Sequence, residues 1–256
     1  MLTSRWAGGR MAATMYALIL AGGKGERLRP LTDSVPKPMV IVDAQPILAH
    51  QVAWLRTAGV TDVVFLVGYL GHMVEGHFGD GADFGVRAHY SYEETPLGRG
   101  GAMRKGLGAI PDSGSPVIAT NGDVITRANI GDLVDDFHTR TAQNRSHLAT
   151  ILTVPMVSPY GIVDTDADGM VRSFSEKATL PYLINGGVYV LNPAIEALLP
   201  EFGDHETTTF PELAASGRMS AVQTDKFWRS VDSFKDLQEV EMYLAGESET
   251  IGREKS

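Results

Sequence analysis

Residues 18–39 read LILAGGKGERLRPLTDSVPKPM, and this stretch decides the fold class of the chain. The apolar run that opens it ends at Ala21. Three glycines and four cations follow that run: Gly22, Gly23, Gly25, Lys24, Arg27, Arg29 and Lys37. Glycine has no Cβ, so the loop backbone comes close to a ligand and its N–H groups point at oxygens, while the cations neutralise charge. A buried strand that opens into such a loop favours a polyphosphate ligand over a surface loop with solvated charges.

The loop matches neither of two common phosphate-binding motifs. No window of the sequence supplies the P-loop pattern G-x-x-x-x-G-K-S/T. The dinucleotide fingerprint G-x-G-x-x-G fits Gly23 and Gly25, but its third glycine falls on Leu28, which cannot give the close helix–strand approach. An NAD-linked dehydrogenase is therefore disfavoured. The prolines on both sides of Lys37 predict that this lysine lies on a stiff extended segment and not in a helix.

Length, composition and charge bound the class of protein. The 256 residues are enough for one large α/β domain or two small ones. The chain has no cysteine, which excludes a disulfide framework and fits the cytoplasm. A net charge of −9 argues against binding to nucleic acid or to a membrane surface, and no apolar run approaches the ~20 residues of a membrane span. Residues 1–14 lack the apolar segment of a signal peptide, so we expect a disordered extension there and a frayed tail at 247–256.

Hydrophobic periodicity predicts alternating strands and helices. Strands are expected at 16–20, 62–67, 86–92, 116–120, 147–154, 184–191 and 219–223, and helices at 46–58, 71–78, 102–107, 130–140, 193–199, 207–216 and 234–244. This order predicts a doubly wound, mostly parallel sheet, with ligands beyond the carboxyl ends of the strands. Residues 160–177 are expected to form a strand, a turn and a strand. Asp166, Asp168 and Gly169 favour a hairpin turn over a calcium loop, because the closing glutamate of an EF-hand is missing.

The stretch from residue 20 to residue 38 resembles the signature of the sugar-1-phosphate nucleotidylyltransferases, roughly L-A-G-G-x-G-x-R-L-x-P-L-T-x-x-x-P-K-P, at every fixed position. Enzymes of this family join a nucleoside triphosphate to a sugar 1-phosphate and release pyrophosphate. The resemblance covers residues 16–245 and implies an α/β, Rossmann-like, GT-A-like nucleotidyltransferase fold with an inserted sugar-binding β region. It implies a single domain at 15–246, whose nucleotide-binding half spans about 16–125 and whose sugar-binding half spans about 126–246. The β-helix domain carried by some relatives is expected to be missing.

The resemblance also implies roles for individual residues. Arg27 and Lys37 would be catalytic. Nucleotide binding is implied for Leu20, Ala21, Gly22, Gly23, Lys24, Gly25, Glu94, Pro96, Gly98, Asn121 and Gly122, and binding of the sugar phosphate for Tyr160, Gly161, Glu176, Lys177 and Asn185. Asp123 and Asp232 would hold Mg²⁺, which typically takes one or two carboxylates plus substrate phosphates. Asp232 has an alternative role as the cap of the helix at 234–244. Ala178 and Ser233 depart from the proline and glycine that are usual in the family.

The sequence gives weaker signals for the identity of the nucleobase and of the sugar. Glu93 and Glu94 stand near the expected base site, and a carboxylate only accepts hydrogen bonds, which suits the N1–H and amino group of guanine. We therefore favour GTP with a mannose-type sugar 1-phosphate, with dTTP, UTP or CTP as alternatives. A non-catalytic nucleotide-binding regulatory domain is a further alternative, although both carboxylates and the cations Arg27, Lys37 and Lys177 are present. Family members are often dimers or tetramers, which leaves a homodimer or a homotetramer open.

Overall fold

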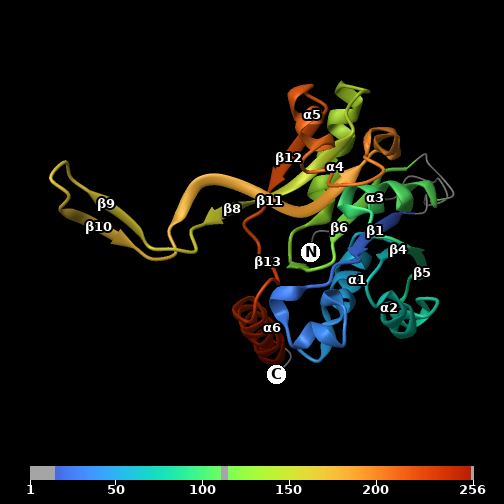
Figure 1. Ribbon diagram of the computed structural model, residues 1–256, viewed down its shortest axis with the longest axis horizontal. Helices are drawn as coiled ribbons and strands as arrows, with labels where there is room; N and C mark the ends of the chain where they lie inside the picture. The colour runs from blue at the N-terminus through green and yellow to red at the C-terminus, as the bar shows by residue number, and fades with distance from the viewer. Residues whose placement is uncertain (1–14, 111–114, 255–256) are drawn as a thin grey trace.

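A computed structural model describes residues 15–110 and 115–254. Its centre is a seven-stranded sheet with the order β12-β8-β11-β6-β1-β4-β5 (Figure 1). The strands are β1 (Tyr16–Ala21), β4 (Asp62–Val67), β5 (Arg87–Tyr92), β6 (Val117–Asn121), β8 (Ala149–Val157), β11 (Thr179–Leu191) and β12 (Met219–Gln223). Neighbouring strands are parallel except where β11 pairs antiparallel with β6 and with β8. The predicted mostly parallel α/β sheet is confirmed.

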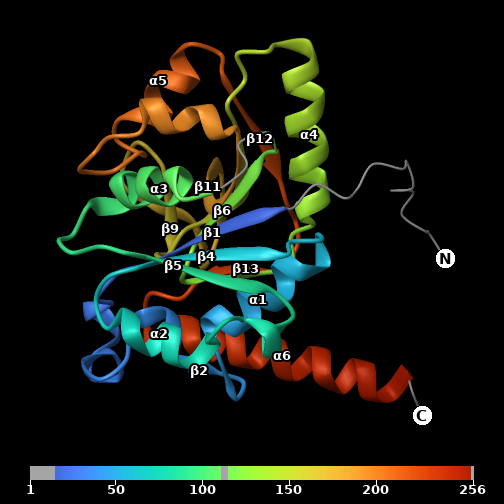
Figure 2. The same cartoon turned by 90° about the vertical axis from the view of Figure 1, so that its right-hand side faces the viewer.

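Helices cover both faces of this sheet. They are α1 (Ile47–Thr57), α2 (Gly71–Phe78), α3 (Gly98–Gly108), α4 (Ile130–Gln143), α5 (Thr209–Ala215) and α6 (Phe234–Glu254). Helices α3 and α5 lie on one side of the sheet, and α1 and α2 lie on the other (Figure 2). None of the helices within the described ranges is both long enough and apolar enough to cross a membrane.

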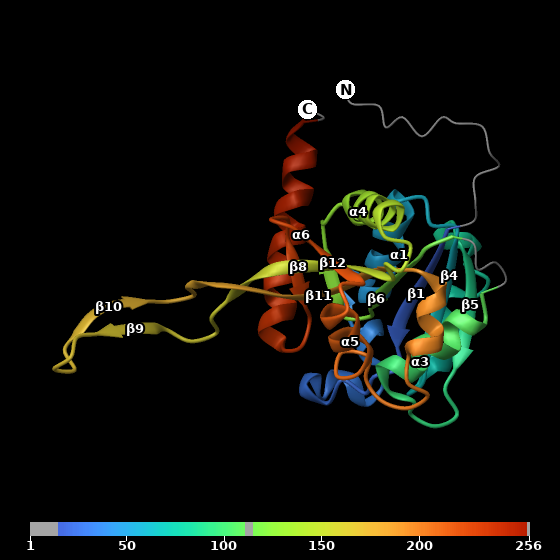
Figure 3. The ribbon, with the colours of Figure 1, turned by 90° about the horizontal axis from the view of Figure 1, so that it is seen from above.

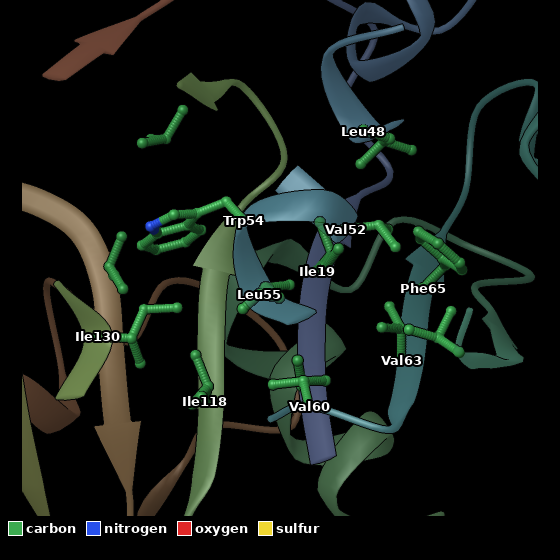
Figure 4. Close-up of a cluster of buried hydrophobic side chains, with 14 of the residues drawn as sticks. Ile19, Leu48, Val52, Trp54, Leu55, Val60, Val63, Phe65, Ile118 and Ile130 are labelled. Carbon is green, nitrogen blue, oxygen red and sulfur yellow. The ribbon is translucent and has the colours of Figure 1, made fainter. Parts of the chain in front are cut away.

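The central strand β1 is buried on both faces, which explains its continuous apolar sequence. Successive side chains of a strand point to opposite faces. Ile19 accordingly joins the cluster that contains Leu48 and Leu55 of α1 (Figure 4), while Leu18 joins the cluster that contains Met103 of α3. Complete burial of one such side chain contributes about 1.5–3 kcal/mol, so both clusters hold β1 in place. The loop that follows β1 therefore starts from a rigid base.

A third apolar cluster fixes the glycine-rich loop itself. Leu28, in the 3₁₀ helix η1 (Glu26–Leu28), is fully buried and belongs to the same cluster as Leu237, Val240 and Leu244 of α6. The last helix of the chain thus supports the first loop. Because α6 packs against Leu28, the C-terminal part of the chain lies beside the glycine-rich loop.

Some of the predicted elements match the structure, and others differ from it. The strands predicted at 62–67 and 219–223 and the helix predicted at 71–78 are confirmed. The prediction that Lys37 lies outside a helix was wrong: it opens the 3₁₀ helix η3 (Lys37–Met39), since prolines at the first positions of a helix need donate no hydrogen bond. Helix α6 continues to Glu254, so most of the predicted tail is helical, and the predicted extension at 1–14 lies outside the described residues.

Two short pairs of strands were not predicted, and one predicted helix is of a different type. Strands β2 (Ile41–Val42) and β3 (Gln45–Pro46) form a small antiparallel pair, as do β7 (Val124–Thr126) and β13 (Trp228–Ser230). The segment expected to form a helix at 193–199 is the 3₁₀ helix η5 (Pro193–Leu198). Strands of two or three residues are too short to show a periodic pattern in the sequence.

A two-stranded arm projects from the body of the molecule. The outer ends of β8 and β11 lead into the hairpin of β9 (Ile162–Thr165) and β10 (Val171–Ser175), which lies well away from the sheet and helices (Figures 1 and 3). The predicted hairpin turn is confirmed, because Asp166 Oδ1 accepts hydrogen bonds from the N–H groups of Asp168 and Met170 at 3.1 and 2.9 Å. We refer to residues 157–183 as the arm.

His205 gives the fold a dependence on pH. Its ring is fully buried against Tyr189 and Phe210, and neither ring nitrogen has a hydrogen-bond partner. Burial lowers the pKa of His205 to about 4, against the opposite effect of the Asp204 carboxylate. Below pH 6.5 the unfolded chain therefore binds a proton that the folded chain excludes, so the free energy of unfolding falls from pH 6.5 to pH 4.

We expect His205→Phe to remove this loss, which amounts to roughly 3 kcal/mol over the whole interval. Urea unfolding at a series of pH values measures it. The same replacement at the exposed His72 serves as the control and should leave the pH profile unchanged. A His205→Phe protein with the wild-type pH profile would contradict the assignment.

Candidate active site

A cleft of about 680 Å³ opens at the carboxyl ends of β1, β4, β5 and β6. It is lined by Leu20, Gly22, Gly23, Lys24, Lys37, Pro38, Gly68, Tyr69, Glu93, Glu94, Pro96, Gly98, Arg99, Ala102, Asn121, Gly122 and Asp123. These four strands are adjacent and parallel, so the loops that follow them meet at one edge of the sheet. Most residues predicted to bind the nucleotide lie in this lining. Ala21 is buried under it, and Gly25 stands beside Lys37.

Two glycines are required by the close packing of the loops. Gly25 has a left-handed φ of 65°, and a Cβ there would lie 2.6 Å from the Cβ of Lys37. A Cβ at Gly122 would collide with the carbonyl oxygen of Leu20, to which the Gly122 N–H donates a hydrogen bond of 2.9 Å. The glycine-rich loop, Lys37 and the turn that carries Asp123 are therefore in direct contact.

Lys37 lies between the two aspartates that were predicted to bind metal. Its Nζ is 2.6 Å from Asp123 Oδ2 and 2.8 Å from Asp232 Oδ1. Arg27 Nη2 is 2.7 Å from the same oxygen of Asp232. The Lys37 side chain is only 12% exposed, whereas that of Arg27 is 77% exposed. The structure thus brings together four residues from three distant parts of the sequence at the mouth of the cleft.

The short pair of β7 and β13 explains how the two aspartates meet. Ser230 of β13 is opposite Val124 of β7, and Val231 N–H donates to the carbonyl oxygen of Asp123 at 2.8 Å. The alternative role of Asp232 as a helix cap is wrong. The Ser233 hydroxyl accepts a hydrogen bond from Asp236 N–H at the start of α6, and the Asp232 carboxylate points to the cations.

The Asp232 carboxyl is held in its ionised form. Burial alone would raise its pKa, but hydrogen bonds from Lys37 and Ser230 and the charges of Lys37 and Arg27 bring the pKa below its ordinary value. The carboxylate is therefore fully charged at neutral pH and available to bind cations.

The other end of the cleft holds two neighbouring glutamates with different surroundings. Glu93 Oε2 accepts a hydrogen bond of 2.7 Å from Leu97 N–H, so this carboxylate braces its own loop. Glu94 is exposed to the cleft, and its carboxylate has no hydrogen bond or ion pair with any other described residue. Of the two, Glu94 is the one free to contact a base.

Arg99 lines the same end of the cleft, and no role was predicted for it from the sequence. It forms ion pairs with Asp204 and Glu206, and Glu206 Oε1 in turn accepts a hydrogen bond of 2.9 Å from Asn185 Nδ2. The amide of Asn185 also donates to Tyr189 and accepts from Gly187 N–H. Asn185 was predicted to bind the sugar phosphate, and the structure shows its amide engaged in this internal network.

The other residues predicted to bind the sugar phosphate lie on the arm. They are Tyr160, Gly161, Glu176 and Lys177. Among the described residues, no hydrogen bond or ion pair joins them to Lys37, Asp123 or Asp232. Lys177 adopts a left-handed φ of 52°, which is uncommon outside glycine, at the joint between β10 and β11. The structure therefore divides the predicted site into a nucleotide part on the body and a sugar part on the arm.

The carboxylates at the cleft fit an Mg²⁺ ion that is shared with substrate phosphates. They do not fit a metal ion whose ligands all come from the protein. No group of three or more His, Cys, Asp or Glu side chains in the described part of the chain could hold a metal ion. Asp123 Oδ1, however, is buried without a hydrogen-bond partner, and a bare carboxylate oxygen in a cleft is a suitable Mg²⁺ ligand. Two carboxylates with room for substrate phosphates match the usual chemistry of this ion.

Gln51 is a further residue that the sequence did not reveal. It lies on the buried face of α1, and its Nε2 donates to the carbonyl oxygens of Asn121 and Val124, both at 2.7 Å. These bonds hold the turn that carries Asp123. The one available signal was a glutamine on an otherwise apolar helix face, since a buried amide needs polar partners.

Comparison with known proteins identifies the class. The sequence profile of the family described as nucleotidyl transferase matches residues 16–247. The chain therefore belongs to the nucleotidyl transferase family, and the resemblance to sugar-1-phosphate nucleotidylyltransferases is confirmed.

Individual relatives narrow the resemblance. A mannose-1-phosphate guanyltransferase of Pichia angusta is 35% identical over 231 residues, which cover 87% of this chain and 62% of that protein. The mannose-1-phosphate guanyltransferase beta-B of Xenopus laevis is 36% identical over 228 residues, with the same coverage. The chain thus spans 62% of the length of these curated relatives. The crystal structure of HddC from Yersinia pseudotuberculosis has the same fold, with a TM-score of 0.69 and 24% identity over 90% of this chain and 100% of that chain.

We expect Gln51→Leu to loosen the turn that carries Asp123. The change leaves two buried carbonyl oxygens without donors, which costs about 2 kcal/mol and lowers the melting temperature by roughly 4–8 °C. Calorimetry measures the shift. Gln143→Leu, the same change at an exposed position, is the control. Equal melting temperatures for the two variants would show that the bonds to the turn contribute nothing.

Proposed function

We propose that the chain transfers a nucleotidyl group from a nucleoside triphosphate to a sugar 1-phosphate and releases pyrophosphate. The observation that carries this proposal is Lys37, held between Asp123 and Asp232 at the mouth of a cleft beside a glycine-rich loop. Such a cluster supplies the ammonium group of Lys37, and carboxylates able to hold a metal ion, where phosphates from two anionic substrates have to meet. The absence of cysteine supports a cytoplasmic location.

The reaction needs positioning and charge more than acid–base chemistry. A sugar-phosphate oxygen attacks the α-phosphorus of the triphosphate, a new P–O bond forms, and the bond to pyrophosphate breaks. The attacking phosphate is already a dianion, so no general base is required. We assign the triphosphate to the glycine-rich loop with Lys24 and Arg27, and the contact between the attacking phosphate and the α-phosphate to Lys37.

Asp123 and Asp232 would hold Mg²⁺. When bound, the ion neutralises charge on the phosphates. The unpartnered Oδ1 of Asp123 supports this assignment, as does the lowered pKa of Asp232. We assign contacts with the sugar and its phosphate to Glu176 and Lys177, as the family resemblance implies.

GTP and a mannose-type sugar 1-phosphate are the favoured substrates. The relatives from Pichia angusta and Xenopus laevis are mannose-1-phosphate guanyltransferases, and the free carboxylate of Glu94 suits the N–H donors of guanine. The alternatives are dTTP, UTP or CTP as the nucleotide, or a regulatory domain that binds a nucleotide without catalysis. A homodimer or homotetramer agrees with the family resemblance.

We expect pyrophosphate release from GTP and mannose 1-phosphate with Mg²⁺, and a loss of at least about 100-fold in Asp123→Asn, because removal of one charge-stabilising contact typically costs 10²–10³ in rate. A coupled assay across four NTPs and dTTP against glucose, mannose and N-acetylglucosamine 1-phosphates measures the rate. Asp225→Asn, at a 90% exposed side chain, is the matched control. Full activity in Asp123→Asn would exclude the metal assignment, and tight GTP binding without release in any pair would favour the regulatory domain.

Glu94 gives a separate test of the base. Wild type should use GTP better than ITP, which lacks the 2-amino group, and Glu94→Gln should lose about 10- to 100-fold in kcat/KM for GTP, the value of a hydrogen bond to a charged group. Its preference over ITP should shrink accordingly. Glu201→Gln changes a 75% exposed glutamate outside the cleft lining and serves as the control. An unchanged ratio of GTP to ITP would remove Glu94 from the base site.

A further inference from the structure

The arm exposes an unusual amount of apolar surface. Nine of the fifteen exposed large hydrophobic side chains among the described residues lie on it: Val157, Tyr160, Ile162, Val163, Met170, Val171, Phe174, Tyr182 and Leu183. A two-stranded hairpin is marginally stable at best by itself in water, and contiguous exposed apolar patches mark interaction sites. The exposed apolar side chains of the arm therefore indicate a surface that binds another protein surface.

Three exposed apolar side chains of the hairpin, those of Val163, Val171 and Phe174, share one face. Phe174 is directly opposite Val163, and Val171 is opposite Thr165, so these side chains point the same way. Phe174 and Val171 are 66% and 62% exposed. Glu176 lies next to this face, because a Cβ added at Gly161 would touch both the Phe174 ring and Glu176 Oε2. Whatever covers the face also meets Glu176.

The arm leaves the body as a paired ribbon whose register shifts between Thr179 and Leu183. Thr179 pairs with Val157, Leu183 pairs with Pro155, and Ser158 N–H donates to the Ala178 carbonyl oxygen at 2.9 Å. This ribbon holds β9 and β10 away from the body of their own chain (Figures 1 and 3). The proposed reaction nevertheless requires the sugar part of the site, Glu176 and Lys177, to face the cluster of Lys37, Asp123 and Asp232.

We propose that the arm docks on a second copy of this chain, with its apolar face against the partner's body and with Glu176 and Lys177 at the partner's cleft. Each active site of the resulting dimer then consists of the nucleotide cleft of one copy and the arm of the other. This inference rests on the proposed function. A second copy is the partner that presents the cleft which these two residues are assigned to complete.

The apolar area is sufficient for a stable dimer. If each of the nine side chains exposes roughly 100 Å², one arm presents about 900 Å² of apolar surface, which compares with the about 800 Å² that each partner buries in a typical specific interface. A reciprocal exchange of arms satisfies the two-fold symmetry of most homodimers, since each copy gives and receives the same surface.

Complementation between two inactive variants tests the shared site. Asp123→Asn damages the cleft and Lys177→Ala damages the arm, so each homodimer should lose at least about 100-fold in rate. The two variants are co-expressed with different tags, and the heterodimer is purified through both tags. Exchanged arms restore one complete site, so we expect about half of the wild-type dimer's rate. An arm that serves its own cleft leaves both sites damaged.

The mass in solution tests the interface independently of activity. Wild type should have twice the mass of one chain, and Val171→Asp, which adds a charge to the apolar face at an exposed position, should have the mass of a single chain. Met242→Asp, at a 76% exposed apolar position on α6, is the matched control and should stay dimeric. Light scattering after gel filtration measures all three.

The outcomes separate this inference from the proposed function. An active wild type with an inactive heterodimer overturns the shared site and leaves the proposed function standing. Full activity in Lys177→Ala overturns both the shared site and the role assigned to Lys177, while the proposed reaction itself stands. A wild type that releases no pyrophosphate from any pair overturns the proposed function, and the mass of Val171→Asp then decides the docking of the arm alone. A Val171→Asp dimer overturns the docking.

Discussion

The ion pairs of Lys37 with Asp123 and Asp232 are the interaction on which the arrangement of the site depends. Two carboxylates repel each other at short range, and a cation held between them turns that repulsion into attraction. Because Lys37 is largely buried, water screens the attraction less than it would at the surface. The three residues come from a 3₁₀ helix, from the turn between β6 and β7, and from the segment before α6. One cluster of charges thus links the beginning, middle and end of the chain.

Much of the fold could be predicted from local sequence patterns. The buried strands β1 and β4 show nearly continuous apolar runs of the right length, and the glycines around Lys24 indicate the loop that lines the cleft. The cleft residues follow from the rule that ligands bind at the carboxyl ends of parallel strands. The strands and the loop depend on residues that are neighbours in sequence, and the position of the cleft depends on a rule of topology. All of them can be predicted from the sequence without knowledge of long-range contacts.

The features that could not be predicted depend on distant partners. Ser230 meets Val124 only through a three-residue strand pair, which is too short to leave a pattern. Arg99 has no local signal for its ion pairs with Asp204 and Glu206, because these acids lie about a hundred residues further along. The hairpin around Asp166 was predicted from its turn, yet its direction follows from the long ladder of β8 and β11. Local chemistry determined the hairpin, and the ladder determined where it stands.

The balance of charge at Lys37 has a consequence for the order in which ligands bind. With Arg27 included, two cations face two carboxylates, so the resting cluster is close to neutral. A divalent ion that arrived alone would add positive charge with nothing to offset it and would compete with an ammonium group tethered to the same chain. An ion carried in by a triphosphate brings its own negative charge. At the proposed metal site, this balance of charge would favour loading of Mg²⁺ together with the nucleotide.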